Sequence, residues 1–227
     1  MSLAIIIPAL NEADNICRTL VSLQAMRAHG VRVIVVDGGS TDTTAALAAT
    51  MADLVIAGAK GRSPQMNAGA AATAEDVLLF LHADSILPSD ADQQIATAIA
   101  EGHCWGRFDI RISGRRMMFS VISWFMNRRS RLTGISTGDQ GLFMTRQAYE
   151  TVGGFPTQLL MEDIEMCKRL KRAGVAGPAS LASRITTSGR RWQQHGLWRT
   201  IILMWRLRFQ YWRGTPAAEL HAAYYGK

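Results

Sequence analysis

The stretch VIVVDGGSTD at residues 33–42 decides the fold. Four apolar, mostly β-branched residues in a row are typical of a strand that is buried on both faces of a parallel sheet. Asp37 and the two glycines after it end this strand and leave a carboxylate at its carboxyl end. In open α/β sheets ligands bind at that edge, so the pattern favours a ligand beside Asp37. A capped strand–helix turn without any ligand explains this stretch equally well on its own.

Size and composition predict a globular protein with one main domain. The chain has 227 residues, of which 48% are hydrophobic and 19% are charged. At about 150 residues per domain, this length indicates one domain or one domain with an appendage. We place the boundary after residue 188, so that residues 1–188 form the main domain. Residues 189–227 then form a basic, aromatic helical segment packed on or beside it.

The net charge of +7 is distributed unevenly. Residues 1–165 contain 13 Lys and Arg against 17 Asp and Glu, whereas residues 166–218 contain 11 basic and no acidic residues. A basic block of this kind usually meets phosphates, which nucleic acid, anionic lipid or a phosphorylated ligand can supply.

Cysteine content and hydropathy indicate a cytosolic protein. Cys17, Cys104 and Cys167 are an odd number without metal-ligand spacing, which favours reduced, buried thiols over a disulfide framework. The N-terminus runs directly into a predicted strand, so we expect no signal peptide. No uncharged apolar run reaches about 18 residues, which argues against a membrane-spanning helix.

Strands and helices alternate along the chain. The predicted strands are residues 3–7, 31–36, 54–57, 77–81, 104–112 and 142–145, followed by one or two within 175–187. Alternation brings the carboxyl ends of parallel strands to one edge, so Asp37, Arg62 and Asp84 are expected there together. The prediction is an α/β protein with a mostly parallel central sheet, helices on both faces and a C-terminal helical appendage.

Helix starts are predicted from capping residues. Ser63 is the expected cap before Pro64, Ser89 caps the next helix, and Ser188 or Gly189 starts the last one.

Two helices carry both aromatic residues and arginines. Residues 115–131 have arginines at both ends of an apolar centre, which suits either packing on the sheet or insertion into a membrane interface. In the last helix an aromatic stripe spans an arc of about 80° beside a row of arginines. The stripe is Trp198, Ile202, Trp205, Phe209 and Trp212, and the row is Arg199, Arg206 and Arg213. Such a stripe is compatible with packing and with recognition.

Five stretches together resemble the family-2 glycosyltransferases of the GT-A fold. They are IIIPALNE (5–12), VVDGGSTD (35–42), GRSPQMNAGA (61–70), LHADS (81–85) and Glu162-Asp163. Each motif is weak alone, but the five occur in the right order between residue 5 and about residue 192. Within the family the chain looks closest to a small soluble bacterial branch associated with arsenosugar-type biosynthesis and selenium-linked gene neighbourhoods.

The resemblance implies a nucleotide site and a metal site. Residues 8–12, among them Pro8, Ala9, Asn11 and Glu12, would line the nucleobase pocket. Asp37 would accept a hydrogen bond from the base or ribose, and Arg62 would lie near the nucleotide. Asp84 matches the last acid of the family's Asp-x-Asp, which holds Mg²⁺ or Mn²⁺ on the diphosphate.

The resemblance also implies the catalytic residues. Asp163, with Glu162 beside it, matches the Glu-Asp pair that supplies the base. The loop residues Asp139 and Gln140 could bind the acceptor or the donor sugar. Arg190, Arg191 and Trp192 resemble the Arg-Trp element that processive relatives use near the diphosphate and acceptor.

His82 departs from the family pattern. It stands where many relatives have the first acid of Asp-x-Asp. Histidine can ligate Mn²⁺ or serve only a structural purpose at a strand end, so both roles stay open.

The sequence therefore predicts a metal-assisted, inverting transfer of a sugar from a nucleoside diphosphate, UDP by the family's habit, to a hydroxyl of a small-molecule or lipid acceptor. A nucleotide-binding module without turnover would not need Glu162 and Asp163. A nucleic-acid-binding protein would leave the acidic strand ends unexplained. A Rossmann enzyme is disfavoured because Gly-x-Gly-x-x-Gly is missing after the first strand. Peripheral membrane contact is compatible with catalysis.

Overall fold

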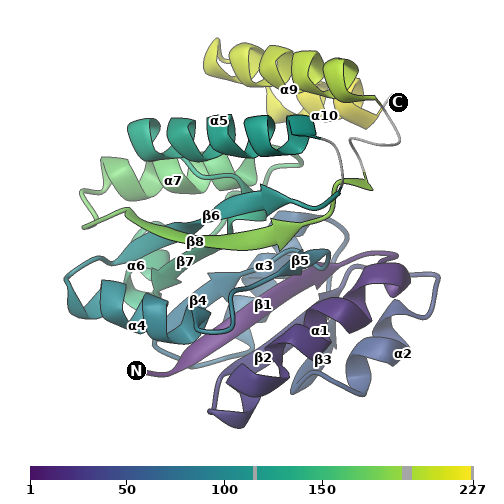
Figure 1. Ribbon diagram of the computed structural model, residues 1–227, viewed down its shortest axis with the longest axis vertical. Helices are drawn as coiled ribbons and strands as arrows, with labels where there is room; N and C mark the ends of the chain where they lie inside the picture. The colour runs from purple at the N-terminus through teal and green to yellow at the C-terminus, as the bar shows by residue number, and fades with distance from the viewer. Residues whose placement is uncertain (115–116, 191–195, 226–227) are drawn as a thin grey trace.

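The computed structural model describes residues 1–114, 117–190 and 196–225 (Figure 1). The strands are β1 (Leu3–Ala9), β2 (Arg32–Asp37), β3 (Leu54–Ala57), β4 (Val77–Phe80), β5 (Ser85–Ile86), β6 (Trp105–Ile112), β7 (Leu142–Thr145) and β8 (Ala179–Thr187). The helices are α1 (Ala13–Ala28), α2 (Thr44–Ala49), α3 (Arg62–Ala71), α4 (Ala91–Ala100), α5 (Met117–Thr133), α6 (Arg146–Thr151), α7 (Glu162–Arg172), α9 (Leu197–Trp212) and α10 (Ala217–Tyr225), and the 3₁₀ turn η1 is Gly138–Gln140.

The strands form one sheet in the order β3-β2-β1-β4-β7-β6-β8-β5. Four of its seven pairings are parallel, namely those among β1 to β4 and that between β6 and β8. β7 is antiparallel to both β4 and β6, and β5 is antiparallel to β8. This topology confirms the predicted α/β class. It also brings the carboxyl ends of β1, β2 and β4 to a single edge.

β1 lies at the centre of the core because every one of its residues is buried. Leu3, Ile5 and Ile7 face a cluster that includes α1 and α4. Ala4 and Ile6 face the opposite cluster, which includes α3, α6 and α7. Alternate residues of a strand point to opposite faces, so an unbroken apolar run is what a strand covered on both sides requires.

Three predicted helix starts are wrong. α3 begins at Arg62 after Gly61, whose φ of 121° suits glycine alone, so Ser63 lies inside the helix. Pro64 is tolerated there because the first amides of a helix have no partner within it. α4 follows Asp90 instead of Ser89. α9 begins at Leu197, well after the predicted start at residue 188 or 189.

The predicted burial of the cysteines is correct only for Cys167. Cys17 and Cys104 are half-buried, and all three thiols are free.

The C-terminal helices pack over the segment that leads into α7. Leu207 of α9 and Leu220 of α10 are buried against Leu160, Met161 and Ile164. Figure 1 shows both helices above the layer formed by α5 and α7. No helix among the described residues is long and apolar enough to cross a bilayer.

Candidate active site

Asp37 is the last residue of β2, and only one of its two carboxylate oxygens accepts hydrogen bonds from the described chain. Its Oδ2 accepts hydrogen bonds from the backbone N–H groups of Gly39 (3.1 Å) and Ser40 (3.0 Å), which holds the side chain in place. Its Oδ1 is buried and has no hydrogen-bond partner in the described part of the chain. Buried acceptors are nearly always satisfied in proteins, so this oxygen is suited to a donor on a ligand.

The loop after β1 is tied to the loop after β2. Asn11, with a left-handed φ of 53°, accepts a 2.8 Å bond from the N–H of Thr41 through Oδ1. Its own N–H donates to the hydroxyl of Ser40 over 2.9 Å. Asn11 therefore fixes the position of the loop at Ser40 and Thr41, which lies at the edge of the predicted nucleobase pocket.

Gln65 fixes the two strand ends against each other, a role that the sequence did not reveal. Its side-chain amide is buried and donates to the carbonyl oxygens of Ala9 (2.8 Å) and Val36 (2.7 Å). The residue lies within the GRSPQMNAGA motif, so part of that motif serves to join β1 and β2.

Glu12 and Arg190 meet although 178 residues separate them in the chain. Nη2 of Arg190 lies 3.1 Å from Oε1 of Glu12, which brings the end of β8 to the start of α1. Both charges act on Asp84: burial and Glu12 raise the pKa of the Asp84 carboxyl, while Arg62 and Arg190 lower it. Predicted residues from three parts of the chain, Glu12, Arg62 and Arg190, thus act on one carboxylate.

His82 is neutral. Burial and the nearby positive charge of Arg62 lower its pKa to about 3. The imidazole packs so closely on Gly138 that a Cβ there would lie 2.5 Å from Nε2. Neutral imidazole can ligate a metal, so its state is compatible with either role left open for His82.

Asp84 fits a divalent cation that is shared with a substrate. Mg²⁺ and Mn²⁺ prefer oxygen ligands, and Mg²⁺ is commonly held by one or two carboxylates together with phosphate oxygens. The only hydrogen bond to the Asp84 carboxylate among the described residues is a 3.5 Å contact from the hydroxyl of Ser85. No group of three acidic, histidine or cysteine side chains that could hold a metal alone occurs in the described ranges.

Asp163 is held at the start of α7 by two backbone donors. Its Oδ2 accepts from the N–H of Gly138 (2.6 Å) and its Oδ1 from the N–H of Ile164 (2.7 Å). Burial and the adjacent Glu162 raise the pKa of its carboxyl to about 6, against the influence of these hydrogen bonds and of Arg62. At neutral pH the carboxylate is thus ionised and basic enough to accept a proton.

Asp163 and Glu162 face the ends of β1 and β4. Together with Pro8 and His82 they line one small cavity. Arg62 links this corner to the rest of the site, because its Nη1 lies 3.9 Å from Oε1 of Glu162.

Asp139 and Arg129 are two buried charged groups that influence each other electrostatically, and each carries polar atoms without a hydrogen-bond partner. Oδ1 of Asp139 and all three guanidinium nitrogens of Arg129 have no hydrogen-bond partner among the described residues. Burial raises the pKa of Asp139, and the charges of Asp139 and Asp163 partly offset the lowering of the Arg129 pKa by burial. Arg129 was missed from the sequence, although it follows Ile122 and Met126 on the inner face of α5 at helical spacing.

Gln140 does not fit its predicted role. Its side chain is fully buried; Oε1 accepts from the N–H of Thr137 (3.1 Å), and Nε2 donates to the hydroxyl of Ser130 (2.9 Å). The residue closes the capping box of η1, so no polar atom of its side chain is left for a sugar or acceptor. Arg191 and Trp192 lie outside the described residues.

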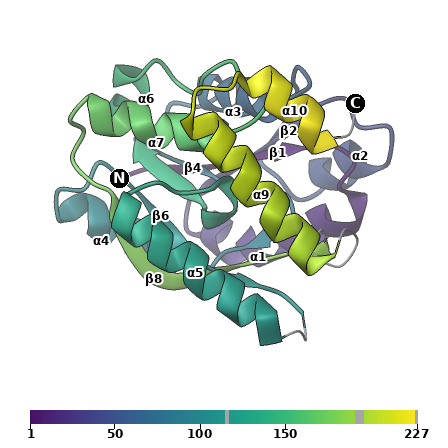
Figure 2. The ribbon, with the colours of Figure 1, turned by 90° about the horizontal axis from the view of Figure 1, so that it is seen from above.

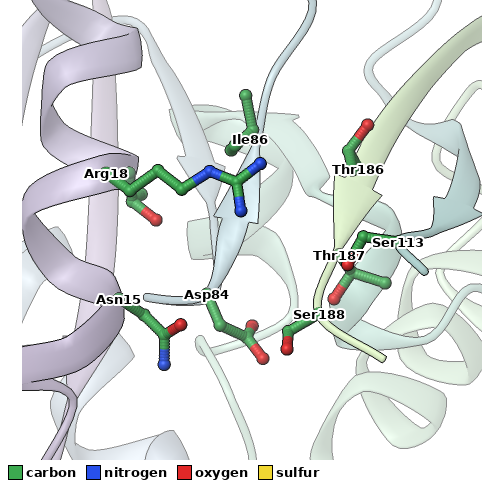
Figure 3. A pocket seen from close by; sticks show the side chains of 9 residues that line it. Asn15, Arg18, Asp84, Ile86, Ser113, Thr186, Thr187 and Ser188 are labelled. Atoms are coloured by element: carbon green, nitrogen blue, oxygen red, sulfur yellow. The ribbon is translucent and has the colours of Figure 1, made fainter. Parts of the chain in front are cut away.

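A cavity of about 40 Å³ opens beside Asp84, between α1 and the ends of β5 and β8 (Figure 3). Arg18 reaches from α1 across this cavity, and Ser188 lies close to the Asp84 carboxylate in the same view. Arg18 is a second cationic side chain that the sequence did not single out.

Asp37 ends β2 with an unpartnered oxygen, Asp84 follows β4, and the buried Asp163 lines a cavity at the ends of β1 and β4. The family model for glycosyl transferase family 2 matches residues 4–152. The chain belongs to this family. The match confirms the resemblance drawn from the motifs at the level of the family.

Solved structures show the same fold. S. aureus TarS 1-349 has 18% sequence identity and a TM-score of 0.66 over 83% of this chain and 61% of that one. The mannosyltransferase PcManGT from Pyrobaculum calidifontis, in complex with GDP-Man and Mn²⁺, has 20% identity and a TM-score of 0.67 over 91% and 60%. Glucosyl-3-phosphoglycerate synthase from Mycobacterium tuberculosis, with Mn²⁺, UDP and glucosyl-3-phosphoglycerate, has 18% identity and a TM-score of 0.62 over 81% and 70%.

These likenesses establish the fold. The chain spans about three fifths of the length of TarS 1-349 and of PcManGT. None of the curated protein sequences matches it.

Proposed function

We propose that the protein is an inverting glycosyltransferase that moves a sugar from a nucleoside diphosphate sugar to an acceptor hydroxyl. The proposal is supported by the parallel pairing of β1, β2 and β4, which puts their carboxyl ends beside Asp37 and Asp84, by the cavity at the ends of β1 and β4 that Asp163 lines, and by membership of glycosyl transferase family 2. Three solved structures of the same fold support it, because they contain UDP-GlcNAc, GDP-Man or UDP.

The acceptor is activated by Asp163. Its carboxylate takes the proton of the acceptor hydroxyl while that oxygen attacks the anomeric carbon of the donor sugar. The bond from this carbon to the diphosphate breaks on the opposite side, and the bonding electrons leave with the nucleoside diphosphate. One displacement inverts the anomeric configuration, and no residue forms a covalent adduct. Glu162 and Arg62 lie beside the general base Asp163 as an ion pair, with Nη1 of Arg62 3.9 Å from Oε1 of Glu162.

The nucleoside diphosphate is bound at the ends of β1, β2 and β4. The free oxygen of Asp37 accepts a hydrogen bond from the base or ribose. Arg62 and Arg190, the two arginines that lower the pKa of Asp84, stabilise the leaving diphosphate. Asp84 would hold a divalent cation, which when bound supplies further positive charge to the phosphates.

Binding of nucleotides tests the first half of the proposal. Thermal shift and calorimetry with UDP, GDP and their sugars, with and without Mn²⁺, should reveal at least one ligand that raises Tm. Asp37→Ala removes a buried acceptor and should weaken that ligand about tenfold or more. Asp92→Ala on α4 is the matched control and should bind normally. If no nucleoside diphosphate stabilises the protein, the proposal fails.

Turnover tests the second half. Release of nucleoside diphosphate from the sugar that binds best should fall by about 10² or more in Asp163→Asn, with nucleotide affinity nearly unchanged. Nucleotide binding in a wild-type protein that never releases product would instead identify a binding module without turnover.

Three finer assignments stay predictions. UDP as the nucleotide, the arsenosugar-associated bacterial branch and a cytoplasmic location rest on the sequence alone. The nucleotide screen addresses the first of them directly.

A further inference from the structure

Helices α5 and α9 carry a large share of the exposed apolar side chains of the protein. On α9 the exposed residues are Trp198, Ile202, Trp205, Phe209 and Trp212, and on α5 they are Met117, Val121, Trp124, Phe125 and Leu132. Trp205 and Trp212 are 73% and 75% exposed, and Met117 is 89% exposed. Exposed apolar side chains in such number on two helices are typical of an interaction surface.

The two helices are neighbours in the outer layer. Ile201 of α9 packs against the cluster formed by Phe119 and Ile122 of α5 with residues of β6. Figure 2 shows α5 and α9 running next to each other, with no other element of the described chain drawn over them. We call the exposed side chains of these two helices the docking face.

Arginines are interleaved with the apolar residues of the docking face. Arg199 and Arg206 are exposed on α9, Arg213 is exposed directly after its last residue, and Arg128 is exposed on α5. Arg131 of α5 is also exposed but pairs with Asp109 over 2.8 Å. At 100° per residue Arg199, Arg206 and Arg213 lie within about 100° of the centre of the aromatic stripe of α9. Residues 166–218, which include α9, contain no acidic residue.

We propose that the docking face binds the surface of an anionic lipid membrane. Tryptophan and phenylalanine rings favour the boundary between headgroups and acyl chains, while arginines beside them pair with lipid phosphates. A second copy of the chain fits less well, because a symmetric contact would place one row of arginines against the other. The match in charge therefore favours lipid over self-association.

The two helices of the docking face also contact residues of the candidate active site through their inner sides. The inner side of α9 covers residues 160–164, and the hydroxyl of Tyr211 donates to Glu165 of α7 over 2.9 Å. The inner side of α5 carries Arg129, whose charge acts on Asp139 and Asp163. A bound membrane would thus lie against α5 and α9, whose inner sides contact the part of the site that contains Asp139 and Asp163.

Vesicle flotation with the full chain tests the proposal. Vesicles of phosphatidylcholine mixed with phosphatidylglycerol should carry the protein, and vesicles of phosphatidylcholine alone should carry far less. The variant W198S/W205S/W212S should lose binding about tenfold or more, and R199Q/R206Q/R213Q should do the same because each arginine contributes at the charged surface. Tryptophan emission should shift to shorter wavelength only with the anionic vesicles.

Matched control variants distinguish an effect of the docking face from an effect of the protein's overall charge or hydrophobicity. V21S removes an exposed apolar residue of α1, and R32Q/R111Q/R172Q removes the same number of charges from β2, β6 and α7. Both should float like wild type, and all variants should keep the wild-type circular dichroism.

Two results would overturn the proposal. One is wild-type protein that stays unbound on anionic vesicles. The other is a dimer in light scattering that W198S/W205S/W212S dissociates, which would make a second copy the occupant. The assay needs no nucleotide, so its outcome is independent of the proposed enzymatic function.

Discussion

The buried carboxyl of Asp163 sets the expected pH dependence of turnover. Burial and Glu162 raise its pKa to about 6, and a general base works only when it is ionised. Activity should therefore fall as the pH drops through about 6, whereas an exposed aspartate would keep activity down to about pH 4. The measurement is kcat/KM from pH 5 to pH 8. An acid limb near pH 4 would remove Asp163 from the role of base.

We expect Arg129 to act as a positioning residue, because its charge favours the ionised form of Asp139 and it interacts electrostatically with Asp163. Its guanidinium is buried without a hydrogen-bond partner in the described chain, which costs stability. Arg129→Met should therefore raise the free energy of unfolding by on the order of 1 kcal/mol and yet reduce turnover. Without the positive charge, the pKa of both carboxyls should rise, so the acid limb should move to higher pH.

Arg111→Gln provides the comparison for Arg129, since it removes an exposed arginine from β6. It should change neither the stability nor the pH profile. If Arg129→Met loses stability and keeps the acid limb in place, Arg129 serves the packing of α5 and has no influence on the base.

At the scale of the element, α3 joins β1 and β2, whose ends form part of the proposed nucleotide site. Gln65→Leu keeps a similar volume but removes the donor shared by the carbonyls of Ala9 and Val36. The carbonyl of Ala9 also accepts from the N–H of Gly38 over 2.9 Å, so the main loss is at Val36. Removing the Gln65 donor should cost about 1 kcal/mol or more, measured by urea unfolding. Gln147→Leu, on the exposed side of α6, should cost little. A loss no larger than that of the control would show that the two carbonyls find other donors.

The sequence predicted the elements of the first half well because their patterns are local. Strand β3 was predicted at its observed bounds, and the runs that became β1, β2 and β4 were found to within two residues. Helix starts were less predictable: α3 begins after Gly61, whose φ of 121° no capping residue reveals. The two-residue strand β5 exists only because β8 lies beside it.

The site divides in the same way. Asp37 ends β2, and Asp84 lies in the loop between the end of β4 at Phe80 and the start of β5; the alternation of strands and helices is what predicted the two residues at one edge. Gln140 and Arg129 depend on how η1 and α5 pack, and their positions were therefore out of reach. A polar residue beside a glycine suggested a ligand contact, whereas packing turned Gln140 inward.

The whole molecule brings distant parts of the chain to Asp84. Glu12 at the start of α1 and Arg190 after β8 both act on this carboxylate, and the described residues offer no complete set of metal ligands around it. A divalent cation should therefore bind weakly to the free protein and tightly only with a nucleoside diphosphate. Thermodynamic linkage then requires that the cation increases the affinity for the nucleotide by the same factor as the nucleotide increases the affinity for the cation.

Calorimetry over the four combinations of protein with and without Mn²⁺ and UDP measures this coupling factor, which should reach about tenfold or more. Asp84→Asn removes the carboxylate that joins cation and phosphates, so the factor should fall to about one. The same change removes a negative charge near the diphosphate and should strengthen binding of UDP without Mn²⁺. Tight binding of Mn²⁺ to the protein alone, or coupling that survives Asp84→Asn, would mean that the cation is held by other residues.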